Sequence, residues 1–286
     1  MWNKFKIKFS ISFLLLLVFA VAPLVMGIVY ALLYSFGIVG VLNNGLTLQH
    51  WRLAFAGNEV LFSFLYTIAL SLISLFLCVS TGMWLAIYLG KRLQKGITSY
   101  IIYLPMAFPS IVAAFFFFQF LSNAGLLSRI FYKMGLVRSV TAFPNLVNDS
   151  YSIGIIVAQF FLTLPVFVLL YLSILHNENI KALDTLASSL GANRLQILWK
   201  ITVPSLLRKS FPTIILFFIF KLGSYEVPLL LGRSSPETIS VLIVRKMQRF
   251  NLMDIPQGYV VAVIYAALVI TLLVISLKPS KLSINV

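Results

Sequence analysis

Charged residues able to act inside a lipid bilayer are scarce in this chain, and two of them lie close together. The 286 residues include only 7 Asp or Glu and 2 His. Lys221 and Glu226 both fall in a strongly apolar stretch that runs from Phe211 to Gly232. A charge at membrane depth is costly unless it faces protein or water, so it often marks the path of a polar solute.

Gly223 and Pro228 bracket Ser224, Tyr225 and Glu226, so we expect the helix to be interrupted there. Broken helices at membrane depth usually line a cavity, because their freed backbone groups need partners. The residues assigned to a translocation pathway are Lys221, Ser224, Tyr225 and Glu226. The alternative is that Lys221 and Glu226 satisfy each other or Tyr225 within the bundle. Five residues correspond to about 140° of helical rotation, which is poor geometry for a Lys221–Glu226 pair.

Motifs for catalysis are absent from the sequence. It contains no G-x-x-x-x-G-K-[ST] for binding nucleotide phosphates, no G-x-S-x-G and no H-E-x-x-H. His50 and His176 are predicted on opposite sides of a membrane, so a His-based metal site is not expected. The single cysteine, Cys78, lies in an apolar run and is most simply a packing residue. We therefore expect no catalytic residue, no metal site and no cofactor bound by this chain.

The composition is that of a polytopic membrane protein, with 60% hydrophobic and 10% charged residues and a mean hydropathy of +1.01. Six apolar runs are long enough to cross a hydrocarbon core of about 30 Å. They are predicted near residues 10–36, 60–89, 99–121, 151–175, 211–232 and 257–277. The Lys and Arg distribution favours cytoplasmic N- and C-termini, which places the segments 37–59, 122–150 and 233–256 outside. The net charge of +15 then indicates topology signals and attraction to anionic lipid headgroups, and not nucleic-acid binding.

A polar segment of roughly 30 residues lies between the fourth and fifth of these spans. Its centre, L-D-T-L-A-S-S-L-G-A-N-R-L-Q-I-L-W-K-I-T-V-P, runs from Leu183 to Pro204. The periodicity predicts two short amphipathic helices hinged at Gly191, with Pro204 in the first turn of the following helix. The apolar stripe before the hinge consists of Leu183, Leu186, Ala187 and Leu190, and the one after it of Leu195, Leu198, Trp199 and Thr202. Such an element is suited to dock into a groove on a partner.

The same segment resembles the cytoplasmic E-A-A loop of permease subunits of bacterial ABC importers. Thr185-Leu186-Ala187 stands at the E-A-A positions, and Ile201 and Pro204 form the closing I-x-x-P. The acidic residue is missing at 185, with Asp184 one place earlier as a possible substitute. The stretches Leu104–Ser110, Asn123–Ser128 and Gly223–Gly232 resemble permeases for polyamines and, more distantly, for iron, thiamine and sulfate. The resemblance covers roughly residues 60 to 275.

This resemblance implies an all-α polytopic membrane protein with six transmembrane helices, in the type I ABC importer permease (MetI-like) architecture of a bacterial plasma (inner) membrane. It further implies a non-catalytic permease that forms half of the translocation pathway. The implied partners are two copies of an ATPase subunit that carries ATP and Mg, a second permease (identical or different), an extracytoplasmic solute-binding protein and the bilayer. The residues implied in ATPase coupling are Asp184, Thr185, Leu186, Ala187, Gly191, Ala192, Arg194, Ile201 and Pro204. Gly191 is expected to form a hinge where a side chain would clash, while Asp184 and Arg194 would contact the ATPase.

The expected organisation is an N-terminal helix and first external loop at 1–59, and a five-helix core at 60–277 that contains the coupling loop 176–210. A cytoplasmic tail follows at 278–286. Glu226 suits a cation such as a polyamine, which is the favoured solute, whereas Lys221 suits an anion such as sulfate. The alternatives are an ATP-independent secondary transporter or channel subunit, and an insertase-like protein-interaction subunit.

Overall fold

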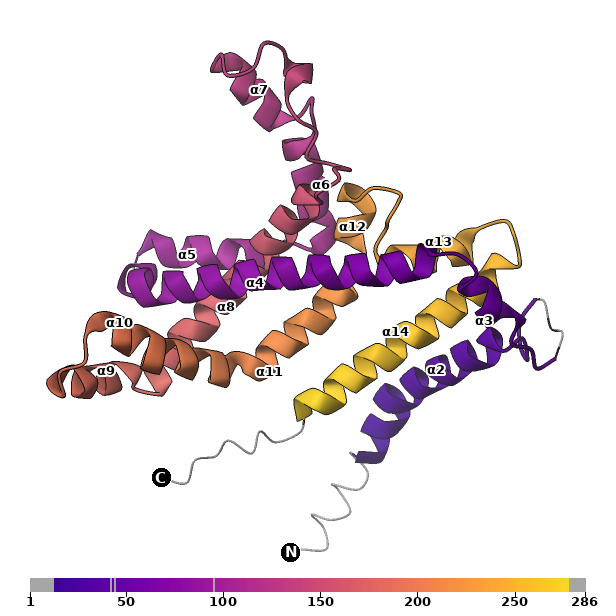
Figure 1. Cartoon of the computed structure of the whole chain (residues 1–286), viewed down its shortest axis with the longest axis horizontal. Coiled ribbons are helices and arrows are strands. Elements are labelled where there is room, and N and C mark those ends of the chain that lie inside the picture. Colours follow the sequence, from indigo (N-terminus) through magenta and orange to yellow (C-terminus); the bar gives the residue numbers. More distant parts are fainter. Residues whose placement is uncertain (1–12, 42, 44, 95, 278–286) are drawn as a thin grey trace, which may run out of the picture. The chain divides into compact units, whose positions relative to one another are not determined.

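The computed structural model describes residues 13–41, 43, 45–94 and 96–277, which form helices joined by turns and loops (Figure 1). The principal helices are α2 (Ala22–Ser35), α3 (Gln49–Ala54), α4 (Glu59–Leu93), α5 (Ile97–Tyr103), α6 (Ser110–Leu121), α7 (Leu126–Lys133), α8 (Ile153–Asn177), α9 (Ile180–Ser189), α10 (Arg194–Ile197), α11 (Val203–Leu222), α12 (Glu226–Leu231), α13 (Ile239–Gln248) and α14 (Asp254–Leu277). The single turns are η1 (Leu17–Val21), η2 (Leu104–Ala107), η3 (Val140–Ala142) and η4 (Leu198–Thr202).

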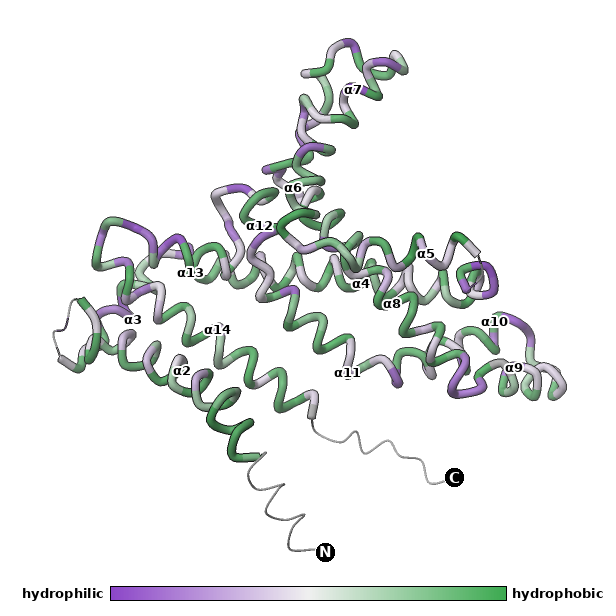
Figure 2. Tube along the Cα trace, turned by 180° about the vertical axis from the view of Figure 1, so that it is seen from behind, coloured by the Kyte–Doolittle hydropathy of each residue, from purple (hydrophilic) through white to green (hydrophobic). Residues whose placement is uncertain are grey.

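Six helical stretches of the described chain are long and apolar enough to span a membrane, as predicted. They are Phe13–Ser35, Glu59–Leu93, Ser110–Lys133, Ile153–Asn177, Arg194–Leu222 and Asp254–Ser276. The residues of these helices are mostly hydrophobic, whereas hydrophilic residues are concentrated in the connections (Figure 2). The expected all-α class with six spans is therefore confirmed.

The third predicted span, 99–121, starts later than expected. Ile97–Ala107 forms a shorter apolar helix of its own, and α6 begins only at Ser110. Phe108, with ψ 124°, and Pro109, with ψ 146°, are extended. A residue before proline is sterically pushed out of the helical region, which explains the break at this point.

The fifth predicted span, 211–232, also differs from the structure. α11 ends at Leu222, with Gly223 as its C-terminal cap, and the residues from Glu226 onward form the separate short helix α12. In the other direction, the helical stretch extends back to Arg194 through η4. The predicted interruption is therefore present, but it ends the spanning helix and is not a bend inside it.

The described chain divides into two compact units. The larger unit runs from Ser63 to Val241 and includes the described residues 272–277. Its core lies where α4, α8 and α11 meet. Phe167, Tyr171 and Leu206 are buried there. A second cluster joins α4, α6, α8 and α12 around Ile155 and Leu231. A Cβ at Gly82 would lie 2.9 Å from that of Phe167, so glycine permits the close approach of α4 and α8.

The smaller unit comprises the described residues up to Phe62 and Leu242–Thr271. The Tyr34 and Tyr259 rings stack with centroids 4.2 Å apart, which joins α2 to α14. His50 is buried, and this burial lowers the pKa of its imidazole. Most of α14 thus belongs to the same unit as α2 and α3. The expected bounds 1–59 and 60–277 stay a prediction. The expected tail 278–286 lies outside the described residues.

Candidate functional site

The polar segment between α8 and α11 forms two helices around a glycine turn, as predicted. α8 ends at Asn177, and Asn179 takes a positive φ of 47° before α9 begins. Ile180, the first residue of α9, is only 1% exposed and packs into the core cluster of α4, α8 and α11. The start of α9 is therefore anchored in the core of the larger unit.

The turn after α9 is a Schellman motif centred on Gly191. The Gly191 N–H donates to the Ser188 carbonyl at 3.0 Å, and the Ala192 N–H donates to the Ala187 carbonyl at 3.0 Å. Gly191 has φ +86°, and no atom lies within 4 Å of the position that a Cβ would occupy. The expectation that a side chain would clash here is wrong. Glycine is favoured by the backbone conformation and not by crowding.

A capping box starts the second short helix. The Asn193 side chain accepts from the Gln196 N–H at 2.8 Å, and the Gln196 side chain accepts from the Asn193 N–H at 3.0 Å. These reciprocal bonds satisfy backbone donors that a helix N-terminus would otherwise leave free. The turn around Gly191 is thus closed on both sides by local hydrogen bonds.

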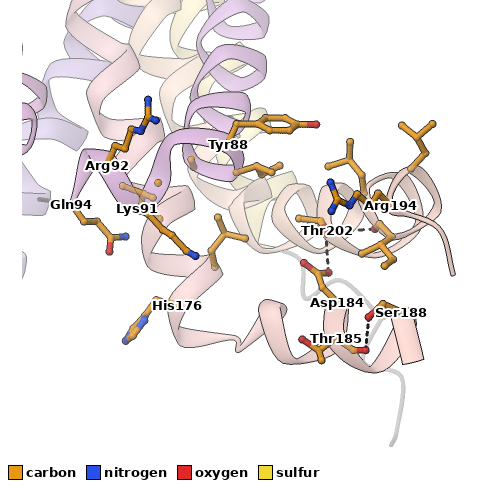
Figure 3. A pocket seen from close by; sticks show the side chains of 18 residues that line it. Tyr88, Lys91, Arg92, Gln94, His176, Asp184, Thr185, Ser188, Arg194 and Thr202 are labelled. Atoms are coloured by element: carbon orange, nitrogen blue, oxygen red, sulfur yellow. Dashed lines mark hydrogen bonds between the residues drawn. The ribbon is translucent and has the colours of Figure 1, made fainter. Parts of the chain in front are cut away.

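A side-chain hydrogen bond ties the two short helices together beyond this turn. The Thr202 hydroxyl donates to Asp184 Oδ1 at 3.1 Å, which links α9 to η4 (Figure 3). The periodicity places Thr202 in the second apolar stripe, whereas the structure buries its side chain. The expected contact between Asp184 and the ATPase stays a prediction, and within the chain the carboxylate accepts the Thr202 hydroxyl. η4 is one π-helical turn, and such turns are often found at functional sites.

The segment carries large apolar side chains that the rest of the chain leaves exposed. Leu190 is 89% exposed and Trp199 65% exposed, and Leu186 is exposed as well. We refer to Leu186, Leu190 and Trp199 as the apolar loop face, whereas the exposed Leu195 lines the cavity described below. Among the other predicted coupling residues, Thr185, Gly191, Arg194 and Pro204 are exposed, and Ala187, Ala192 and Ile201 are partly buried. Uncovered side chains of this size on a structured loop are typical of an interaction surface.

A cavity of about 800 Å³ lies on the inner side of the same segment, between it and the ends of α4 and α8. Its polar lining includes Lys91, Arg92, Asp184, Arg194 and Thr202 (Figure 3). The sequence periodicity could not predict this cavity, because its lining comes from α4, α8 and the α9–α10 segment, which are far apart in the chain.

Lys221 lies inside the larger unit and is 6% exposed. Its ammonium donates to Ser74 Oγ at 2.8 Å, to Thr163 Oγ1 at 3.2 Å and to the Gln159 carbonyl at 3.5 Å. The acceptors come from α4 and α8, so the alternative of pairing with Glu226 or Tyr225 is not what the structure shows. Ser74 and Thr163 were missed by the sequence analysis; their polar side chains within apolar spans were the available signal.

The other predicted pathway residues lie nearer the surface. Ser224 and Tyr225 are partly buried in the connection after α11, and Glu226 is exposed in the first turn of α12. A carboxylate is favoured there because the helix N-terminus carries partial positive charge. The structure therefore separates buried Lys221 from exposed Glu226, which the sequence analysis had grouped in one pathway lining.

Comparison with known proteins agrees with this architecture. Residues 78–278 match the family model of the binding-protein-dependent transport system inner membrane component. An osmoprotective compounds uptake permease protein, GgtC of Synechocystis sp., is 24% identical over 249 residues, covering 84% of this chain and 87% of that protein. The sulfate transport system permease protein CysT of Synechocystis sp. is 28% identical over 184 residues, or 64% of this chain and 60% of that protein.

Solved structures show the same fold. A bacterial ABC transporter involved in the import of the acidic polysaccharide alginate matches with a TM-score of 0.69 at 20% identity, covering 98% of this chain and 99% of that one. A bacterial alginate ABC transporter in complex with an alginate pentasaccharide-bound periplasmic protein matches with a TM-score of 0.68 at 19% identity, covering 96% and 92%.

The fold and the matches define a multi-pass, non-catalytic permease with the type I ABC importer fold. The chain belongs to the family of inner membrane components of binding-protein-dependent transport systems. It is accordingly the membrane component of an ABC importer that depends on a binding protein, and not the ATP-independent transporter, channel or insertase-like subunit considered as alternatives.

Proposed function

We propose that this chain forms half of the solute pathway of an ATP-driven importer, and that a separate ATPase subunit drives it through the apolar loop face. The single observation that carries this proposal is the strong exposure of Leu190 and Trp199 on a segment that is closed by a Schellman turn and a capping box. A partner helix or groove that covers these side chains would bury apolar surface, worth roughly 25 cal/mol per Å².

The rest of the assembly follows from this role. Two ATPase subunits would hold ATP and Mg, because no P-loop occurs in this chain. A second permease, identical or different, would complete the pathway, and a binding protein would deliver the solute to the segments 37–59, 122–150 and 233–256. The N- and C-termini and the loop 176–210 would then lie in the cytoplasm.

Regarding the solute, we propose a small polar molecule whose first candidate is a polyamine-like cation. The support is that Lys221 uses its charge inside the chain, whereas Glu226 remains exposed. The sulfate relative makes an anion the necessary comparison. Uptake of radiolabelled spermidine and sulfate by cells that overproduce the complete transporter would separate the two. Uptake of sulfate alone would overturn the preference for a cation.

The coupling role is tested by replacing one residue of the apolar loop face. Leu190→Glu places a charge where apolar contact is proposed, and its side chain is too exposed to affect the fold. We expect the amount of ATPase that co-purifies with the tagged chain in mild detergent to fall at least about tenfold, which corresponds to about 1.4 kcal/mol of lost contact.

Leu136→Glu is the matched control, because Leu136 is 62% exposed in a segment expected outside the membrane. It should retain the ATPase. Equal recovery of the ATPase with Leu190→Glu and with the unchanged chain would refute the assignment.

A further inference from the structure

We propose that the cavity between α4, α8 and the α9–α10 segment is a binding site for the phosphate headgroup of an anionic lipid. It is distinct from the apolar loop face, and lipid binding there does not require the ATPase.

The charges around this cavity favour an anion. Lys91, Arg92 and Arg194 line it, against the single carboxylate of Asp184. Lys91 and Arg194 direct their charged ends toward the cavity from opposite sides (Figure 3). The salt bridges found in the described part of the chain use other cations, so these three remain available to a ligand.

Asp184 does not neutralise this surplus. Its Oδ1 accepts the Thr202 hydroxyl at 3.1 Å, which holds the carboxylate toward η4. Lys and Arg together are the usual partners of a phosphate, Arg through its planar fork and Lys as a point charge. The shared ligand chemistry is therefore a phosphate group, which a lipid or a free anion could supply.

The apolar part of the lining favours the lipid. Ile87, Leu172 and Leu175 form walls of the same cavity and belong to the helical stretches that are long enough to span the bilayer. A soluble anion gains nothing from such walls, whereas a lipid could lay the upper part of an acyl chain along them. Lys91 and Arg92 lie in the last turn of α4, and Arg194 is the first residue of α10. This is the level at which lipid headgroups are expected. Clusters of Lys and Arg beside spanning helices are typical sites for anionic headgroups.

A lipid at this position would contact both the ends of α4 and α8 and the α9–α10 segment. It would therefore stabilise the present arrangement of the segment on the helix ends, and the lipid composition of the membrane would influence coupling.

The test is native mass spectrometry of the purified chain after addition of phosphatidylglycerol or, separately, phosphatidylcholine. The unchanged chain should retain phosphatidylglycerol preferentially. Lys91→Gln together with Arg194→Gln should lower this retention roughly thirtyfold, because each cation near an anionic headgroup contributes about 1 kcal/mol. The control is Lys200→Gln with Arg208→Gln, which also removes two exposed cations from the neighbouring segment but none from the cavity. It should retain the lipid.

Three outcomes would overturn the proposal. Equal retention of both lipids would show that charge does not select the ligand. An equal loss in the control would show a general charge effect and not a site. Displacement of phosphatidylglycerol by millimolar inorganic phosphate would assign the site to a soluble anion. Since the chain is tested without the ATPase, failure here leaves the coupling role intact, and failure of the Leu190→Glu test leaves the lipid site intact.

Discussion

At the scale of single residues, Gly191 sets the path of the chain between α9 and α10. Its φ of +86° is unfavourable for residues with a Cβ, although open space surrounds it. A substitution at this position is therefore expected to act through backbone strain and not through steric conflict with neighbours.

We predict that Gly191→Val weakens the link between the permease and its ATPase more than Gly191→Asn. Asn tolerates the left-handed region, whereas a β-branched residue there costs roughly 1–3 kcal/mol. The measurement is the amount of ATPase that co-purifies with each variant. The amount of ATPase recovered with Gly191→Glu should be lower than with Gly191→Asn, because Glu combines backbone strain with a new charge. Equal retention by the Val and Asn variants would show that the positive φ is not required for coupling.

Lys221 is a second residue whose surroundings allow a prediction, here for the free energy of unfolding. It is buried among hydroxyl and carbonyl acceptors from α4 and α8. We predict that Lys221→Ala lowers the free energy of unfolding by roughly 2–5 kcal/mol, because it leaves a cavity and removes three hydrogen bonds. Lys221→Met fills most of the space and should cost less than about 1.5 kcal/mol.

Thermal unfolding in detergent distinguishes these cases. If both variants keep full stability while the assembled transporter loses uptake, Lys221 acts in the pathway and its buried bonds are not its main role.

At the scale of elements, a hydrogen bond between the side chains of Asp184 and Thr202 links α9 to η4. Because η4 continues directly into α11, a force on α9 can reach that spanning helix through this bond. We predict that Asp184→Ala and Thr202→Val each speed hydrogen exchange of the Ile180–Ser189 amides about fivefold, which corresponds to roughly 1 kcal/mol. The double variant should add little to either single one.

Asp184→Asn is the control for this prediction, because its side-chain carbonyl can still accept the Thr202 hydroxyl. Exchange as fast in Asp184→Asn as in Asp184→Ala would mean that the charge of Asp184, and not the hydrogen bond, stabilises α9.

The same elements show how far the sequence could predict the structure. The hinge at Gly191 and the six spans follow from periodicity and hydropathy, which are local properties. The end of α11 at Leu222 and the start of α6 at Ser110 differ from the predicted bounds. The apolar sequence continues across both positions, whereas the helical conformation does not. The acceptors of Lys221 and the role of Asp184 depend on residues far apart in the chain, which local patterns do not report.

At the scale of the whole molecule, the single cysteine makes topology measurable. Cys78 is buried, so the chain offers little background to a thiol reagent. We predict that Leu136→Cys reacts with a membrane-impermeant maleimide in spheroplasts, whereas Leu190→Cys reacts only after the membrane is opened. Both positions are well exposed, so access decides the result. Labelling of Leu190→Cys in intact spheroplasts would place the loop outside and rule out its contact with a cytoplasmic ATPase.

The ATPase is proposed to act on the apolar loop face, and site-specific crosslinking in native membranes can detect this contact. A photo-crosslinking amino acid at position 190, with position 136 as the control, would be activated by light and the products identified by mass spectrometry. We predict that position 190 crosslinks to a nucleotide-binding subunit and that position 136 does not. Crosslinks from position 190 to lipid alone, with the ATPase present in the same membranes, would show that the ATPase does not contact this face.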